Sequence, residues 1–274
     1  MKESNIIGIQ GVPRSGTSWL GQLINASPQV NFKFQPLFSY AFKDAINEKS
    51  STEAIMQFFN KLSVSNDDFI NMRDSDLLRD YPTFTKNQTQ THLVFKQVRY
   101  HFLIEHLLKS IPNIKFILIM RNPLEVLNSW RKAPREFNAN WNFNTEWNNA
   151  NLKNLGRKEE YFGYQKWREA SELFLALAEK YPNNVLLIKY HNLNMHTTSV
   201  IEQIYGFLDL EIDEQVISFI DKSKNKTSNH PNSVYKSSDY STNEYKKEIP
   251  KEIQKFVIND LKSSKLNELF LDGI

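Results

Sequence analysis

The side chains between Arg14 and Ser18 have the types and the order of an anion-binding loop. They read Arg-Ser-Gly-Thr-Ser, after the apolar run NIIGIQ (5–10) and before the helical pattern TSWLGQLINA. A turn between a strand and a helix aims several backbone N–H groups at one point, and the helix dipole adds partial positive charge there. Ser15 and Thr17 can add hydroxyl donors, and Arg14 adds a guanidinium that binds an oxyanion through two N–H groups. The stretch therefore predicts a cradle for a phosphate or sulfate group.

The loop departs from the phosphate-binding loop of NTPases at one position. Gly11 and Gly16 have the spacing of that loop, but Thr17 stands where NTPases carry the lysine that contacts the β- and γ-phosphates. NTPases also place an acidic residue on Mg²⁺, whereas the apolar run FILIM here leads directly into Arg121. A site lined by this arginine, the loop arginine and Lys96 can neutralise an anion without a metal. The sequence therefore predicts a strongly anionic donor and no bound metal ion.

Two further motifs, together with the loop, carry a resemblance to a known family. RSGTSWL resembles the 5′-phosphosulfate loop of the sulfotransferases that use 3′-phosphoadenosine 5′-phosphosulfate (PAPS), and its Arg-Ser-Gly form is similar to the carbohydrate and bacterial-type branch. RNPLEVLNS gives Arg121 and Ser129 the spacing of the pair that holds the 3′-phosphate of PAPS in that family. LLIKYHNL resembles a family strand whose final tyrosine, here Tyr190, lies near the adenine. The resemblance covers residues 5–36, 91–132 and 163–210.

The resemblance implies a role for each matching residue. Lys96 lies inside the apolar run LVFKQV and is similar to the family lysine near the transferring sulfuryl group, with Arg99 as a helper. Trp19 would contribute to the adenine pocket, and Lys224 or Lys236 would close over the 3′-phosphate. The donor-binding residues implied in this way are Arg14, Ser15, Gly16, Thr17, Ser18, Trp19, Arg121, Ser129, Tyr190 and Lys236.

The general base departs from the family pattern. Cytosolic members carry a histidine two residues after the strand lysine, where this chain has Val98, and carbohydrate-type members carry a Glu-Pro pair, where it has Gln35 followed by proline. An amide cannot accept the proton of a hydroxyl acceptor. We expect His101, just past the strand, to be the base, because an unperturbed imidazole titrates near neutrality; Glu136 is another candidate. The catalytic residues expected from the sequence are Arg14, Lys96 and His101.

Two polar segments interrupt the regular pattern. Residues 131–160 are rich in Asn yet carry aromatic rings, and residues 221–247 are polar and basic. Disorder is one interpretation of both segments, and a lid or binding loop is the other. We interpret the first as an insert on the acceptor side, because aromatic rings stack on the C–H faces of sugars; alternatively, the rings anchor the insert to the domain. The rings in and next to it are Trp130, Phe137, Trp141, Phe143 and Trp147.

The strands and helices that would position these residues alternate along the chain. Four short apolar runs predict strands at 5–10, 91–98, 114–120 and 184–190, with helical patterns between them. Near-continuous apolar runs are typical of parallel strands covered on both faces. The pattern predicts an α/β fold over 1–274 as one domain, with a parallel sheet flanked by helices, and the resemblance implies the P-loop-like fold of sulfotransferases. With the first and third strands close together, their carboxyl ends would form the ligand-binding crevice.

Composition disfavours several other classes of protein. The 34 basic and 31 acidic residues leave a formal net charge of +3, which gives no support for nucleic-acid binding. The chain has no cysteine, which excludes disulfides, thiolate zinc sites and a cysteine nucleophile, and its six histidines are scattered. No apolar run has the length of a signal sequence or a membrane span, and we expect a cytoplasmic protein.

The resemblance implies a sulfotransferase that moves a sulfuryl group from PAPS to a hydroxyl group of an acceptor, which the branch suggests is a carbohydrate or glycoconjugate. Two alternatives remain open from the residues. One is a P-loop-type nucleotide kinase, which the absent lysine disfavours. The other is a non-catalytic module that binds PAPS or a nucleotide, which the two absent family bases favour.

Overall fold

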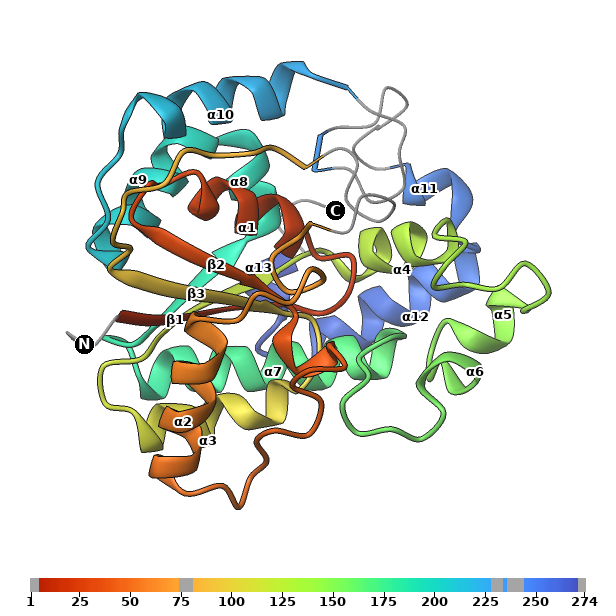
Figure 1. Cartoon of the computed structure of the whole chain (residues 1–274). Helices are drawn as coiled ribbons and strands as arrows, with labels where there is room; N and C mark the ends of the chain where they lie inside the picture. Colours follow the sequence, from red (N-terminus) through yellow and green to blue (C-terminus); the bar gives the residue numbers. More distant parts are fainter. Residues whose placement is uncertain (1–4, 74–80, 228–233, 236–243, 271–274) are drawn as a thin grey trace.

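A five-stranded parallel sheet forms the centre of the protein (Figure 1). The computed structural model describes residues 5–73, 81–227, 234–235 and 244–270. All neighbouring strands are parallel, so the predicted α/β fold with a parallel sheet is confirmed. The strands, in the spatial order β2-β3-β1-β4-β5, are β1 (Asn5–Gln10), β2 (Val30–Phe34), β3 (His92–Gln97), β4 (Lys115–Met120) and β5 (Val185–Lys189).

Four strands match the four predicted runs to within a residue at each end. The first and third predicted strands are neighbours, as expected, because β1 pairs with β4 from Ile7 to Gln10. The edge strand β2 was not among the predicted runs. Its sequence VNFKF is short, and it contains Lys33, whose buried ammonium donates to Ser65 O at 3.1 Å and Asn71 Oδ1 at 2.8 Å. Hydrophobic pattern alone does not reveal a strand whose buried lysine finds its partners in a distant loop.

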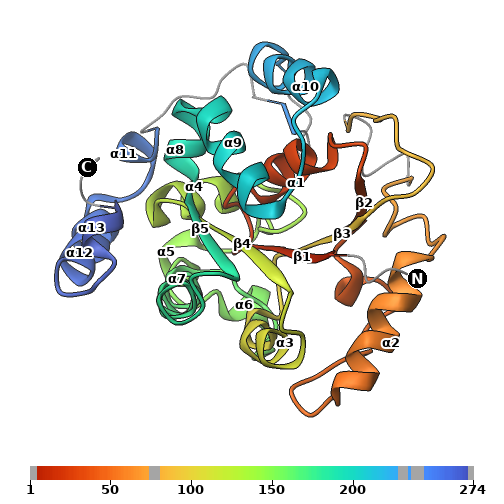
Figure 2. The same cartoon turned by 90° about the vertical axis from the view of Figure 1, so that its left-hand side faces the viewer.

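Helices cover both faces of the sheet, as the end-on view shows (Figure 2). One face carries α1 (Thr17–Asn25), α8 (Tyr190–Met195), α9 (Thr197–Leu208) and α10 (Glu214–Asn225). The other carries α2 (Thr52–Ser63), α3 (Ile104–Ser110) and α7 (Tyr164–Lys180). Helix α4 (Pro123–Arg131) follows β4 and packs with α7, α11 (Tyr245–Glu248) and α12 (Lys251–Lys262). The shorter helices are η1 (Pro36–Phe38), η2 (His101–Leu103), α5 (Phe143–Glu146), α6 (Asn151–Asn154) and α13 (Asn267–Phe270).

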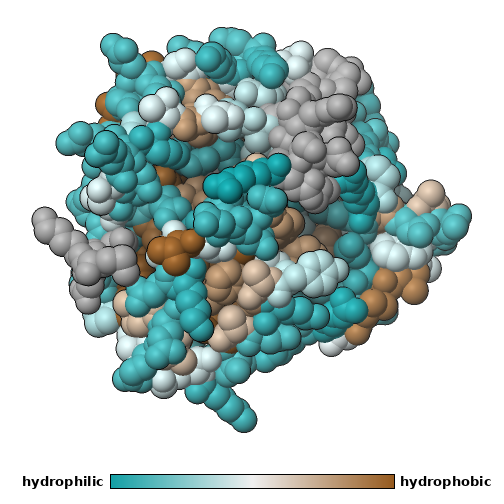
Figure 3. All heavy atoms as spheres, viewed as in Figure 1, coloured by the Kyte–Doolittle hydropathy of each residue, from teal (hydrophilic) through white to brown (hydrophobic). Residues whose placement is uncertain are grey.

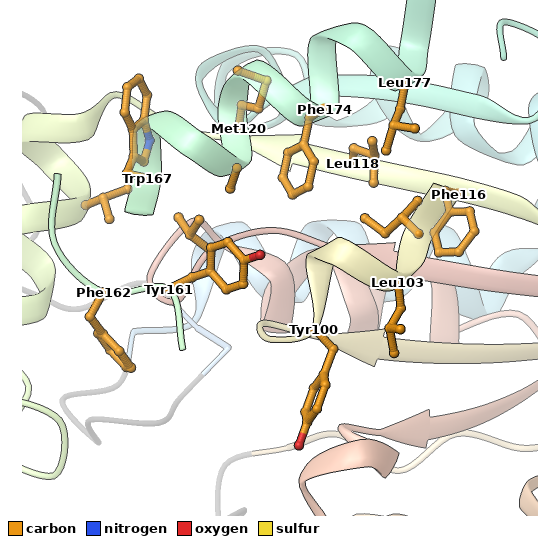
Figure 4. Close-up of a cluster of buried hydrophobic side chains, with 14 of the residues drawn as sticks. Tyr100, Leu103, Phe116, Leu118, Met120, Tyr161, Phe162, Trp167, Phe174 and Leu177 are labelled. Carbon is orange, nitrogen blue, oxygen red and sulfur yellow. The ribbon is translucent and has the colours of Figure 1, made fainter. Parts of the chain in front are cut away.

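Alternate residues of the strands fill two hydrophobic cores, one on each face. Ile7 and Ile9 of β1 are fully buried in the core beneath α1 and α9. On the opposite face, Phe116 and Leu118 of β4 pack in the same cluster as Phe174 of α7 (Figure 4). Because successive side chains point to opposite faces, a strand buried on both faces must be apolar throughout. This explains the continuous apolar runs that predicted β1 and β4.

The polar segment 131–160 packs onto the domain through its aromatic rings. Trp130 at the end of α4 is 1% exposed, and Phe137 lies edge-to-face with it at a centroid distance of 5.1 Å. Trp147 makes a similar contact with Phe256 of α12 at 5.3 Å. Burial of large rings dominates the packing energy of such a segment. These contacts support the alternative in which the rings anchor the insert.

Most of the second polar segment is outside the described residues, and Lys236 is among those not described. Lys224 is exposed near the end of α10. The face of the molecule seen in Figure 3 is mostly hydrophilic, with smaller apolar areas near its middle. Within the described ranges, no helix has both the length and the apolar character needed to cross a bilayer.

Candidate functional site

The loop between β1 and α1 has the backbone of an anion cradle. Arg14 and Gly16 have positive φ angles of 71° and 95°, so the chain turns sharply before α1 begins at Thr17. Ser15 is buried, and its Oγ donates to Val12 O at 2.7 Å, which holds the turn. The N-cap residue is Gly16, which has no side chain to cap the first amides of α1. The N–H groups of this first turn can therefore bind an anion at the positive end of the helix dipole.

Side chains from α4 and the end of β4 meet this loop. Arg14 Nε donates to Ser129 Oγ at 3.1 Å, although the two residues are 115 positions apart. Arg121 Nη1 donates to Arg14 O at 3.1 Å, and Arg121 Nε forms a 2.8 Å salt bridge with Glu125. The contacts arise because β1 and β4 are adjacent parallel strands, so both chains leave the sheet at the same edge. The structure therefore brings the two predicted anion-binding motifs together.

Aromatic rings border the same loop. The Arg121 guanidinium lies 4.3 Å from the centroid of the Tyr190 ring, and Trp19 contacts that ring edge-to-face at 6.2 Å. A Cβ on Gly16 would lie 2.4 Å from Tyr190, so only glycine permits this approach. The indole Nε1 of Trp19 is buried, and no described residue accepts its hydrogen bond. The two predicted rings therefore lie together beside Arg121, and the indole N–H of Trp19 is available to donate a hydrogen bond.

Lys96 brings a buried cation to the carboxyl end of β3. Its residue is 3% exposed, its Nζ donates to Ser18 Oγ at 3.2 Å, and the Phe34 ring lies 4.7 Å away. Among the described residues, no carboxylate is within 4.0 Å of this ammonium. Burial lowers the pKa of Lys96 from 10.5 to about 7, although the charge of Glu136 acts in the opposite direction. An anion bound here would stabilise the charged form.

Arg99, the expected helper of Lys96, is held by other groups. Its Nε forms a 2.9 Å salt bridge with Glu160, and both side chains are largely buried. Its Nη1 donates to Gln35 Oε1 at 3.3 Å, and its guanidinium stacks 4.1 Å from the Phe38 ring centroid. Arg99 is therefore an internal link that orients the Gln35 amide, and its charge is already compensated by Glu160.

The position of His101 does not fit its predicted role as the base. The residue is 0% exposed, and its Nδ1 donates to Gln10 Oε1 at 2.9 Å. Its ring packs on Tyr161 and Phe174, which Figure 4 labels in the buried hydrophobic cluster. Burial lowers the pKa of His101 to about 3. A base must reach the acceptor hydroxyl, and this imidazole is enclosed in the core instead.

Glu136, the other candidate base, lies beside the cations. Its Oε2 is 3.9 Å from Arg14 Nη1, and its charge acts on Lys96. Sequence reasoning missed Phe34, which packs on Lys96, and Glu125, which pairs with Arg121. Glu125 had a signal, because it lies in the first turn of the helix that begins two residues after Arg121, close enough along the chain to pair with that guanidinium. Phe34 had none, because the strand that carries it was not predicted.

The assembled groups are suited to an elongated anion with an aromatic end. Two guanidinium groups, one ammonium and a helix N-terminus provide positive charge, and the Trp19–Tyr190 pair provides ring faces. Such donors can stabilise charge that develops on a transferring oxyanion. In the part of the chain that the structure describes, no group of three or more His, Asp or Glu side chains is placed to hold a metal ion.

Comparison with known proteins gives a family match. The model of the sulfotransferase family matches residues 7–214, which include the loop, Arg121, Ser129 and Tyr190. No curated protein sequence matches this chain significantly.

Solved structures with the same fold are distant in sequence. Mouse sulfotransferase SULT7A1 complexed with PAP is 14% identical, with a TM-score of 0.59 over 97% of this chain and 86% of that one. A sulfotransferase from Alicyclobacillus acidocaldarius is 15% identical, with a TM-score of 0.52 over 98% and 96%. Retinol dehydratase in complex with retinol and PAP is 16% identical, with a TM-score of 0.53 over 95% and 82%. At this level of identity the likeness concerns the fold.

Proposed function

The chain belongs to the sulfotransferase family, and we propose that it transfers a sulfuryl group from PAPS to a hydroxyl group of an acceptor. One observation carries the proposal: Arg14 of the loop contacts both Ser129 and Arg121, so the two anion-binding motifs form one site. The product nucleotide is adenosine 3′,5′-bisphosphate, which corresponds to the PAP bound by the mouse and retinol dehydratase structures.

The residues of the site fit such a donor from end to end. The amides of residues 15–18, Arg14 and Lys96 bind the 5′-phosphosulfate. Arg121 and Ser129 bind the 3′-phosphate, and the Trp19–Tyr190 pair contacts the adenine. The buried ammonium of Lys96 supports this assignment, because a buried charge requires a partner and the described residues offer it only a hydroxyl and a ring.

The chemistry that follows is an in-line displacement without a covalent enzyme intermediate. The acceptor oxygen bonds to sulfur as the bond between sulfur and the bridging oxygen of the phosphosulfate breaks. Arg14, the loop amides and Lys96 stabilise the charge that grows on the bridging and non-bridging oxygens. Lys96 is placed for this because its ammonium and the loop hydroxyl of Ser18 are 3.2 Å apart.

For the acceptor we propose a carbohydrate or glycoconjugate, on the likeness of RSGTSW and of the Gln35–Pro36 pair to that branch. Partly exposed rings near Lys96 support an acceptor with C–H faces, because such faces stack on aromatic rings. The ring centroids of Phe34 and Phe69 are 5.4 Å apart, and Phe38 is 48% exposed. Retinol dehydratase has the same fold and binds retinol, so the fold by itself does not identify the acceptor. The test is a panel of sugars, alcohols and phenols with PAPS as donor, and transfer confined to alcohols or phenols would refute a sugar acceptor.

Binding of two nucleotides tests the donor. Isothermal titration of adenosine 3′,5′-bisphosphate and of ADP, each with and without Mg²⁺, should show tight metal-independent binding of the bisphosphate alone. Arg121→Ala should lower the affinity for the bisphosphate about 10- to 100-fold, because it removes hydrogen bonds to a charged group. The affinity for ADP should stay nearly unchanged. Arg157→Ala, an exposed residue of the insert, is the matched control.

The outcomes separate this function from its rivals. Equal affinity for ADP, or an absolute need for Mg²⁺, would contradict the 3′-phosphate site and favour a nucleotide kinase. Tight bisphosphate binding without transfer from PAPS to any acceptor in the panel would favour a non-catalytic binding module.

A further inference from the structure

We propose that Glu136 is the general base that accepts the proton of the acceptor hydroxyl, an assignment that rests on the proposed sulfuryl transfer. The site needs a base, since His101 is enclosed in the core and Val98 and Gln35 occupy the positions where the family resemblance would place one. Glu136 is a carboxylate from another element, the turn that follows α4.

The Glu136 carboxylate faces the reacting end of the site. Its Oε2 lies 3.9 Å from Arg14 Nη1, which is close enough for attraction but too far for a hydrogen bond. That oxygen is buried, and no described residue donates a hydrogen bond to it. Of the charges acting on buried Lys96, that of Glu136 is the largest. A carboxylate oxygen without a hydrogen bond, 3.9 Å from the guanidinium that would hold the transferring group, is placed to receive a proton.

The backbone that carries this carboxylate is firmly held. The amides of Glu136 and Phe137 both donate to Ala133 O at 2.8 Å, which closes a tight turn. Trp130 Nε1 donates to Glu136 O at 3.2 Å, and Phe137 packs edge-to-face on the Trp130 ring. The aromatic rings of the insert thus position the carboxylate relative to Ser129, which precedes Trp130 on the same helix. A base must be held within hydrogen-bond reach of the proton it takes.

Two other carboxylates of the described residues near the site each have one oxygen in a salt bridge, although Glu160 Oε2, like Glu136 Oε2, is buried without a hydrogen-bond partner among the described residues. Glu160 is bound to Arg99 at 2.9 Å, and Glu125 to Arg121 at 2.8 Å. Each carboxylate is tied by a hydrogen-bonded salt bridge to a guanidinium, and this contact holds it away from an acceptor hydroxyl. Glu136 has only the longer contact to Arg14, which can turn toward the phosphosulfate when the donor binds.

Each bond that forms in the proposed transfer is matched by a bond that breaks. The acceptor O–H bond breaks as its oxygen forms a bond to sulfur, and the proton moves to the Glu136 carboxylate. The bond from sulfur to the bridging oxygen breaks, and its electron pair stays on the 5′-phosphate of adenosine 3′,5′-bisphosphate. The products are a sulfate ester and protonated Glu136, which returns its proton to water after release.

The test compares wild type, Glu136→Gln and the charge-matched control Glu159→Gln, a residue of the same insert with no hydrogen bond or salt bridge from its side chain to a described residue. Sulfuryl transfer from PAPS is measured at one mildly alkaline pH, with an alcohol, a sugar, phenol and p-nitrophenol as acceptors. For acceptors that hold their proton, Glu136→Gln should lower kcat about 10²- to 10⁴-fold. For p-nitrophenol, which is largely ionised, kcat should stay within about threefold of wild type.

Two readouts separate this role from a structural one. Binding of adenosine 3′,5′-bisphosphate to Glu136→Gln should stay within about threefold of wild type, since the base does not contact the nucleotide. Formate added to Glu136→Gly should restore part of the lost transfer, because a free carboxylate can occupy the vacated position.

The results that would contradict these expectations differ in what they would overturn. Wild-type protein that transfers to none of the acceptors would overturn the proposed function, and this role with it. Active wild type with an equally active Glu136→Gln would overturn this role alone. An equal loss of kcat with ionised and un-ionised phenols, or a loss of bisphosphate binding that accounts for the fall in activity, would make Glu136 a positioning residue for Arg14.

Discussion

Replacing Lys96 by methionine should remove a large part of the pH dependence of the stability of the ligand-free protein. The perturbation keeps a long side chain in the same pocket beside Phe34 but takes away the buried ammonium. Methionine cannot donate to Ser18, whose hydroxyl is partly exposed and can turn to water. The variant therefore isolates the cost of burying a cation without an anion.

The magnitude follows from the two protonation equilibria. The pKa of Lys96 is 10.5 in the unfolded chain and about 7 in the folded protein, because burial disfavours the charged form. Between these values the unfolded state binds more protons, so stability rises with pH. At about 1.4 kcal/mol for each pKa unit, the wild type should gain about 3 kcal/mol relative to Lys96→Met between about pH 7 and about pH 9.5.

The assay is reversible urea unfolding of both proteins across this pH range, without nucleotide. All other titrating groups cancel in the difference between the two unfolding free energies. Lys255→Met, which changes an exposed lysine on α12, should show no such trend. A difference between wild type and Lys96→Met that does not change with pH would refute the argument that this ammonium is buried and uncompensated.

Two further substitutions test the loop and the core. Gly16→Ala should lower affinity for adenosine 3′,5′-bisphosphate about tenfold and reduce the melting temperature, because the new methyl group meets Tyr190. Gly156→Ala has a similar positive φ but open space, so calorimetry and thermal melts on both separate the clash from backbone strain. His101→Phe should lower the free energy of unfolding by about 1–3 kcal/mol, since it leaves Gln10 without its partner, yet change kcat less than threefold. A large loss of kcat with unchanged stability would restore His101 as the base.

Much of the fold was predictable because its signals are local. A buried parallel strand needs side chains that are apolar on both faces, and β1, β4 and β5 show this directly in sequence. Strand β2 lies at the sheet edge and buries Lys33 against polar partners from a distant loop, so its pattern is not that of an apolar strand. Strand β5 is also at an edge, yet its run VLLIK is apolar and predicted the strand, so the polar partners of Lys33 rather than edge position conceal β2.

The sequence predicted the loop and the side chains that meet it, whereas its expected base, His101, is enclosed in the core and Glu136 was only the alternative. Lys96 is conspicuous because a charge within an apolar run needs an anion or a crevice. His101 is only five residues farther along, yet the turn through η2 directs it into the core. Glu136 is 40 residues from Lys96, yet the packing of Trp130 and Phe137 places its carboxylate beside the loop arginine. Distance along the chain cannot distinguish these two outcomes, because tertiary packing decides both.

The two hydrogen bonds of Arg14 have a consequence for how binding energy is shared. Its side chain is tied to Ser129 and its carbonyl oxygen to Arg121, so the groups proposed to contact opposite ends of the donor also hold each other in place. Contributions from such connected residues are not additive. The binding energy lost when Ser129 and Arg121 are both replaced should therefore differ from the sum of the separate losses. By the reciprocity of coupled sites, a ligand group at one end should change the affinity for the group at the other end by the same factor in both directions.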